Sequence, residues 1–243
     1  MKTRAWHRSL GGLLALPVLA LALYVGPLSL LLSLALYTAI SISVTCGYHR
    51  LFAHSAYTTA RVWHWVFGIV GSIAINSSPA QWSMVHSAHH KYADTARDPH
   101  TTDWRYFFRF KDRTNIPPGR EGLRLLRDPM HQFFVNHSFS LSMGYALLTL
   151  LLGGLWGLLF LYAVPVCGFL FISGIHSMYS HNTQGSLNRP WLEFLLPLCG
   201  EWIHKQHHGQ PYVTPFPGGM DLGGYFIELI RTDGIRSTNR ALG

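Results

Sequence analysis

Residues 86–94 read His86-Ser87-Ala88-His89-His90-Lys91-Tyr92-Ala93-Asp94, and this histidine-rich stretch decides how the rest of the chain is interpreted. On a helix, His86 lies three and four residues before His89 and His90, so the imidazoles can converge from one face. Such a convergence is typical of a metal site built on a helix.

Two further histidine groups resemble this stretch. His204-Lys205-Gln206-His207-His208 lies near the C-terminus, and a looser pair, His49 and His54, precedes both. Three boxes of histidines exceed what a structural core would use, because each buried imidazole needs a partner. A metal ion is the natural shared partner, and so many nitrogen donors are too many for one ion. The sequence therefore predicts two metal ions.

Charged side chains are scarce. Of 243 residues, 49% are hydrophobic and 12% are charged, whereas charged residues make up about 25% of soluble proteins. The net charge of +8 comes without a nucleic-acid-binding motif, and basic residues that flank apolar runs are typical of membrane proteins. The composition predicts one membrane domain over residues 1–243, with the lipid bilayer and no nucleic acid as a partner.

Apolar runs predict an all-α integral membrane fold with four spans, at about residues 9–25, 28–48, 138–152 and 155–176. Turns at Gly26-Pro27 and Gly153-Gly154 would join them into two hairpins. Basic residues cluster outside these turns, so the positive-inside rule places both termini and all histidine boxes in the cytoplasm. Residues 49–137 and 177–243 would form a cytosolic helical cap that carries the metal ligands, with a shallow or re-entrant helix over residues 62–81.

The donor types narrow the choice of metal. Zinc sites use three or four ligands, and copper or haem sites need thiolate, thioether or axial histidines. The three cysteines, Cys46, Cys167 and Cys199, show no metal-type spacing and are expected to be free thiols. Imidazole also suits iron, and two redox-active iron ions (Fe2+/Fe3+) account for paired boxes plus a third.

The boxes, in this order and spacing, resemble those of membrane fatty-acid desaturases, and most of all the stearoyl-CoA (acyl-CoA) desaturase branch. The resemblance covers roughly residues 30–235 and includes Asp221-Leu222-Gly223-Gly224-Tyr225-Phe226. It implies metal binding by a set of nine histidines: His49, His54, His86, His89, His90, His176, His204, His207 and His208. His181 is the alternative to His176. The family has asparagine four residues before this ninth histidine, where Ile172 stands here.

The resemblance also implies the reaction. Two iron ions would use O2 to insert a cis double bond into an acyl chain carried by coenzyme A or an acyl-carrier protein. Electrons would come from a separate ferredoxin, rubredoxin or b-type cytochrome. The departure at Ile172 keeps related oxidations open: hydroxylation, acetylene formation, or alkene formation with loss of the carboxyl carbon. The distant alternative is a membrane metal-binding protein without catalytic activity.

Several neighbouring residues have expected supporting roles. Asp94, Asp98 and Glu201 lie beside the boxes and could accept hydrogen bonds from ligand histidines, although capping or surface ion pairing is the alternative. Tyr37 precedes His49 by twelve residues, about 18 Å along a helix. It could close a substrate tunnel, or simply pack between helices. Finally, six basic residues lie near the boxes: Arg50, Lys91, Arg97, Arg105, Arg109 and Lys111. They are expected to contact the phosphates of coenzyme A, an acidic carrier protein or an acidic electron donor, or else anionic lipid headgroups.

Overall fold

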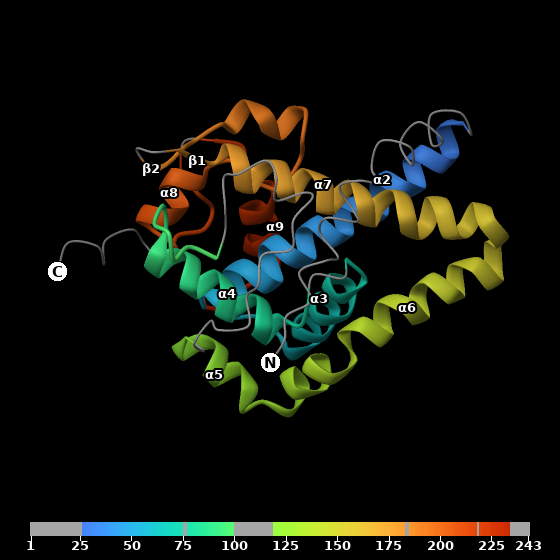
Figure 1. The fold of residues 1–243 in the computed structure, drawn as a ribbon, viewed down its shortest axis with the longest axis horizontal. Helices are drawn as coiled ribbons and strands as arrows, with labels where there is room; N and C mark the ends of the chain where they lie inside the picture. Colours follow the sequence, from blue (N-terminus) through green and yellow to red (C-terminus); the bar gives the residue numbers. More distant parts are fainter. Residues whose placement is uncertain (1–25, 75–76, 100–118, 183–184, 218, 234–243) are drawn as a thin grey trace.

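The computed structural model describes residues 26–74, 77–99, 119–182, 185–217 and 219–233. This part of the chain is mostly helical, with one short antiparallel pair of strands (Figure 1). In chain order the elements are α2 (Pro27–Ile42), η1 (Ser43–Ala53), α3 (Arg61–Ile73), α4 (Pro79–Tyr92), α5 (Arg120–Leu126), α6 (Pro129–Leu158), η3 (Leu159–Ala163), α7 (Val164–Tyr179), β1 (His181–Asn182), β2 (Gly185–Ser186), η4 (Pro190–Phe194), α8 (His204–Gly209) and α9 (Leu222–Ile230).

The first long helix consists of α2 and η1. Gly26, with φ 109°, precedes Pro27 at the first helical turn, where the missing N–H of proline would have no helical partner. From Ser43 the helix is wound as a π-helix, a rare form that is frequent at functional sites. Every residue of η1 is buried, so the histidine near its end lies in the interior.

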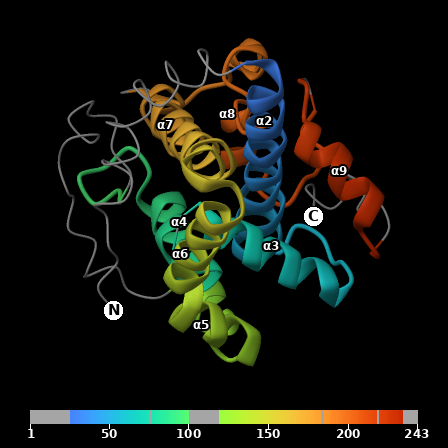
Figure 2. The same ribbon diagram turned by 90° about the vertical axis from the view of Figure 1, so that its right-hand side faces the viewer.

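A helical hairpin follows from α6 through η3 to α7. The helix is interrupted at Gly154, which has φ 59° and ψ −151°. Gly157 packs so closely on Thr149 that a Cβ there would collide with the Thr149 carbonyl. Figure 1 shows α6 and α7 diverging from this turn, and Figure 2 shows α2 lying between α7 and α9. The chain thus turns at Gly154, where the sequence predicts the turn of the second hairpin.

Among the described residues, two helical stretches are long and apolar enough to cross a membrane: Pro27–Ala53 and Pro129–Tyr179. The second of these contains both arms of the hairpin. The predicted span at residues 9–25 lies outside the described residues. The four-span arrangement and the cytosolic position of the cap therefore stay predictions.

Residues 62–81 form two helices, and not the single shallow helix that the sequence predicts. α3 ends at Ile73, and α4 begins at Pro79. The Ser78 hydroxyl accepts the Gln81 N–H at 3.3 Å, and the Gln81 side chain accepts the Ser78 N–H at 3.2 Å. This reciprocal cap, with proline in the first turn, starts a new helix. α4 can therefore take its own direction and carry the second histidine box.

Small residues bring η1 close to its neighbours. A Cβ at Gly47 would collide with Phe67 of α3, and one at Gly71 of α3 would collide with Tyr48. On the other side, the Tyr48 ring meets Trp82 of α4 edge-on, with centroids 6.4 Å apart. η1 is thus packed between α3 and α4, which fixes where the first and second histidine boxes meet.

Candidate metal centre

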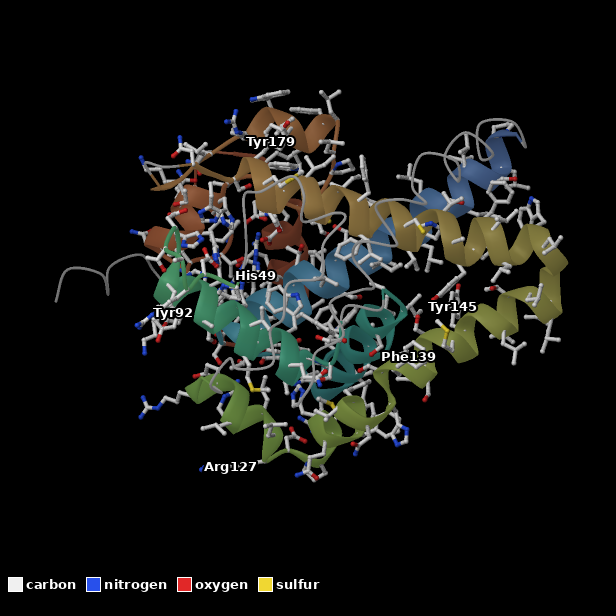
Figure 3. All side chains as sticks on the ribbon, in the orientation of Figure 1. His49, Tyr92, Arg127, Phe139, Tyr145 and Tyr179 are labelled. Atoms are coloured by element: carbon white, nitrogen blue, oxygen red, sulfur yellow. The ribbon has the colours of Figure 1, made fainter. Side chains whose placement is uncertain are left out.

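Nine imidazoles, eight from η1, α4, β1 and α8 and one from His54 directly after η1, gather in two adjacent clusters. The five-histidine cluster contains His49, His54, His86, His90 and His207. The four-histidine cluster contains His89, His181, His204 and His208. In each cluster the candidate ligand atoms all lie within 4.8 Å of one another. Figure 3 shows His49 in the interior beside α4, with Tyr92 at the outer end of that helix.

The imidazoles of each cluster face one another through their Nε2 atoms. In the five-histidine cluster the Nε2–Nε2 distance is 2.9 Å for His49–His207 and 2.8 Å for His54–His86. In the four-histidine cluster, His181 and His204 approach to 2.8 Å. Nitrogen atoms that converge in this way cannot all donate to one another, because a neutral imidazole has one N–H. A cation bound by their lone pairs satisfies all of them, so the donors fit a metal ion in each cluster.

Burial keeps five of these imidazoles in the form that binds metal. It lowers the pKa of His90 to about 3 and that of His208 to about 2, and the neighbouring histidines add to the effect. Burial also holds the pKa of His86, His204 and His207 well below the usual range. The side chains are therefore neutral near pH 7, and a neutral imidazole presents a lone pair to a metal.

Carboxylates lie behind three of these histidines. The Nδ1 atom of His49 is 2.8 Å from Glu201, and that of His89 is 2.9 Å from Asp98. His181 Nδ1 is 3.0 Å from Asp94. In each case Nδ1 faces the acid and Nε2 faces the cluster, an arrangement that fixes the tautomer and the ring orientation. The three acids named from the sequence thus all lie against cluster histidines.

His181, the alternative that the sequence offers for the ninth histidine, lies in the four-histidine cluster, and His176 lies outside both clusters. The Nε2 atom of His176 donates to the main-chain carbonyl of Glu201 at 2.9 Å. His181 follows the end of α7 in strand β1, so its ring reaches the cluster from outside the helix. Spacing alone could not show where α7 ends. The residue four positions before the cluster histidine is then Ser177, and not Ile172.

The other histidines within the described part of the chain lie outside both clusters. His131 is buried, and its ring meets Phe52 edge-on with centroids 4.8 Å apart. His64 is half-buried against Phe52, and His137 packs on Phe133. His100 and the basic residues of the 100–118 stretch lie outside the described residues.

A pocket borders both clusters and extends between η1 and α7. Its apolar walls include Val44, Phe169 and Leu198, and Ser177 adds a hydroxyl near the histidines. Tyr37 lies behind Phe169, with ring centroids 6.4 Å apart, and its hydroxyl donates to the carbonyl of Pro197. Tyr37 itself does not line this pocket, and it contacts the pocket wall through Phe169.

No family model matches the chain, but named relatives do. The sn-1 stearoyl-lipid 9-desaturase of Anabaena variabilis is 27% identical over 188 residues, which cover 70% of this chain and 67% of that protein. The Delta(9)-fatty-acid desaturase fat-5 of Caenorhabditis elegans is 29% identical, with 72% of this chain and 60% of that protein covered. Stearoyl-CoA desaturase 5 of Homo sapiens is 27% identical, with 76% and 63% covered.

These likenesses agree with the two histidine clusters. The chain is similar to named fatty-acid desaturases at 27–29% identity. Its match spans 60–67% of the length of these three desaturases. Its two histidine clusters fit a site for two metal ions. The apolar helices agree with a membrane protein.

Proposed function

We propose that this protein holds one iron ion in each histidine cluster and inserts a cis double bond into a fatty acyl chain with O2. The observation that carries the proposal is the convergence of nine Nε2-bearing rings on two adjacent points, in a homologue of named desaturases. Five donors in one cluster exceed the four of a closed structural zinc site. Imidazole donors suit iron, and a pair of irons supplies the oxidising power that an unactivated methylene group requires.

The reaction balances with an external reductant. The acyl chain loses two hydrogen atoms from neighbouring methylene carbons, and O2 becomes two molecules of water with two further electrons and two protons. The described residues contain no motif for flavin, nicotinamide or haem, so we assign the electrons to a separate ferredoxin, rubredoxin or b-type cytochrome. The acyl chain would be carried as a thioester of coenzyme A or of a carrier protein.

The role of the protein in this reaction is to hold the metal ions and the acyl chain in place. Glu201, Asp98 and Asp94 would orient three ligand rings through their Nδ1 atoms. Trp82 stacks on His86 with centroids 4.7 Å apart and limits how that ring can tilt. Ring orientation matters because a small misplacement of reacting groups costs large factors in rate.

The pocket between η1 and α7 would hold the acyl chain. Val44, Phe169 and Leu198 give it apolar walls that exclude water from the methylene groups next to the ligands. We assign Tyr37 to the closed end of this tunnel, where it would limit the length of chain that is accepted. Its support is the packing of its ring against Phe169. In the proposed topology, four spans carry a cytoplasmic cap, and both termini are also cytoplasmic.

A lipid profile of cells that express the protein tests this function, with a His89→Ala, His90→Ala variant as the inactive control. New monounsaturated chains that disappear in the variant would support desaturation and locate the double bond. Hydroxylated lipids or terminal alkenes in their place would require a different oxidation on the same metals. No O2-dependent product from an iron-loaded protein with a competent electron donor would contradict an enzymatic role.

A further inference from the structure

Arg50 directly follows the ligand candidate His49, yet its side chain is fully buried. The guanidinium donates to both carboxylate oxygens of Asp221, at 2.7 and 2.9 Å, and to the Thr214 hydroxyl at 3.2 Å. It also lies over the Phe216 ring, 4.3 Å from the centroid. Arg50 therefore does not belong to the basic surface that the sequence predicts. It forms a buried Arg50–Asp221 pair with the C-terminal segment.

Asp221 organises that segment around the guanidinium. Its carboxylate accepts the Phe216 and Gly224 N–H groups, each at 2.8 Å, and so caps α9 while it binds Arg50. The turn before the third box presses on the same carboxylate: a Cβ at Gly200 would collide with Asp221. The backbone at Gly200 has φ 97°, which favours glycine. The turn that leads into the third histidine box is thus in direct contact with the Arg50–Asp221 pair.

Glu201, the next residue, connects the pair to the five-histidine cluster. Its Oε2 atom lies 2.8 Å from His49 Nδ1, and its Oε1 atom lies 3.7 Å from Arg50 Nη2. Oε1 accepts no hydrogen bond, so the Arg50 charge is the favourable contact on that side. Both Nη atoms of Arg50 donate to the Asp221 carboxylate. Arg50 therefore attracts Glu201 by charge without pulling the Glu201 carboxylate away from His49.

We infer that the Arg50–Asp221 pair positions Glu201, and through it His49, in the five-histidine cluster. The C-terminal segment would then be a part of that metal site although it supplies no ligand. This inference rests on the proposed metal-binding function. Without the Asp221 charge, Arg50 would be left with Glu201 as its acidic partner. The stronger Arg50–Glu201 contact would compete with His49 Nδ1–H and loosen that ring.

The test uses Asp221→Asn in the purified full-length protein, loaded with 57Fe. We expect the iron affinity of one site to fall about 10- to 100-fold, as for other hydrogen-bond partners of ligands, while the second site stays filled. Mössbauer spectra should lose the signal of one site. The mirror variant is Asp98→Asn, which removes the acid behind His89 in the four-histidine cluster. It should weaken the other signal and thereby assign the two.

Asp128→Asn is the matched control. It removes an Asp from an Arg–Asp pair of similar length, 2.6 Å to Arg61, in which the Arg61 side chain is 52% exposed. That variant should keep both iron signals. If Asp221→Asn does not fold, the double variant Arg50→Met, Asp221→Leu decides, because apolar residues of similar volume commonly replace a buried ion pair without loss of stability. It should fold and still bind iron weakly at the five-histidine cluster.

Unchanged iron stoichiometry and unchanged spectra in the folded variants would overturn the inference, since the pair would then serve the fold alone. That result differs from a failure of the proposed function. In the latter case the unmodified protein would not bind two iron ions, whatever stands at residue 221.

Discussion

His181→Ala should empty the four-histidine cluster, whereas His176→Ala should leave it filled. His181 contributes one of four candidate donors, and its Nε2 atom lies 2.8 Å from that of His204. The Nε2–H group of His176 donates to the Glu201 carbonyl at 2.9 Å, so this nitrogen presents no lone pair to a metal ion in the cluster. The two variants therefore distinguish the proposed metal ligand from a neighbouring histidine that lies outside the cluster.

The expected magnitudes differ clearly. Loss of a hydrogen-bond partner behind a ligand costs about 10- to 100-fold in metal affinity, which is about 1.4–2.7 kcal/mol at about 1.4 kcal/mol per tenfold. Loss of the His181 ligand itself should cost at least the upper end of this range. Asp94→Asn removes the carboxylate that faces His181 Nδ1, and its loss of metal affinity should fall within this range. His176→Ala should remove one hydrogen bond, about 1 kcal/mol of folding stability, and leave the metal affinity unchanged.

The assay is the release of ferrous iron to a coloured chelator under anaerobic conditions, with total iron measured beforehand. In His181→Ala, about half of the iron should be absent or should leave in a fast phase, and Asp94→Asn should show an intermediate rate. Normal iron retention in His181→Ala together with loss of iron in His176→Ala would refute this placement of the ninth ligand.

Three other variants test separate parts of the structure. Tyr37→Leu should shift the products towards longer acyl chains if Tyr37 closes the tunnel, as gas chromatography of the products can show; an unchanged chain-length profile would remove Tyr37 from that role. Gly200→Ala, at φ 97° and against Asp221, should lower the free energy of unfolding by at least the ~1–3 kcal/mol of a strained backbone, and a wild-type melting temperature would contradict the packing described. Arg124→Ala removes a surface pair with Glu121 in which the arginine side chain is 55% exposed, and its effect on stability should stay below about 1 kcal/mol.

The histidine boxes could be found from the sequence because their spacing is local. Residues three and four apart share a helix face, and His86, His89 and His90 do lie on α4. Although they share this helix, His86 and His90 join the five-histidine cluster and His89 joins the other. The turn at Gly154 is equally local, since only a residue without Cβ adopts φ 59° there at little cost.

Contacts between segments that are distant along the chain could not be predicted from the sequence. Arg50 and Asp221 are 171 residues apart, and nothing in the neighbourhood of Arg50 distinguishes a buried guanidinium from a surface one. The choice between His176 and His181 depended on where α7 ends, which spacing does not determine. The break between α3 and α4, in contrast, could have been predicted from the sequence. Ser78-Pro79 followed by Gln81 is a helix start signal, and it lies within the residues 62–81 that were expected to form one helix.

The most direct test of the central claim is a product analysis with the purified, iron-loaded protein in lipid nanodiscs. A labelled stearoyl thioester, O2 and a reduced ferredoxin would be supplied, and the acyl products would be identified by mass spectrometry beside a His86→Ala control. The expected product is a cis-monounsaturated chain that has lost two hydrogen atoms, contains no oxygen from O2, and is absent from the control. An oxygenated product, or no O2-dependent product despite two bound iron ions, would contradict this expectation.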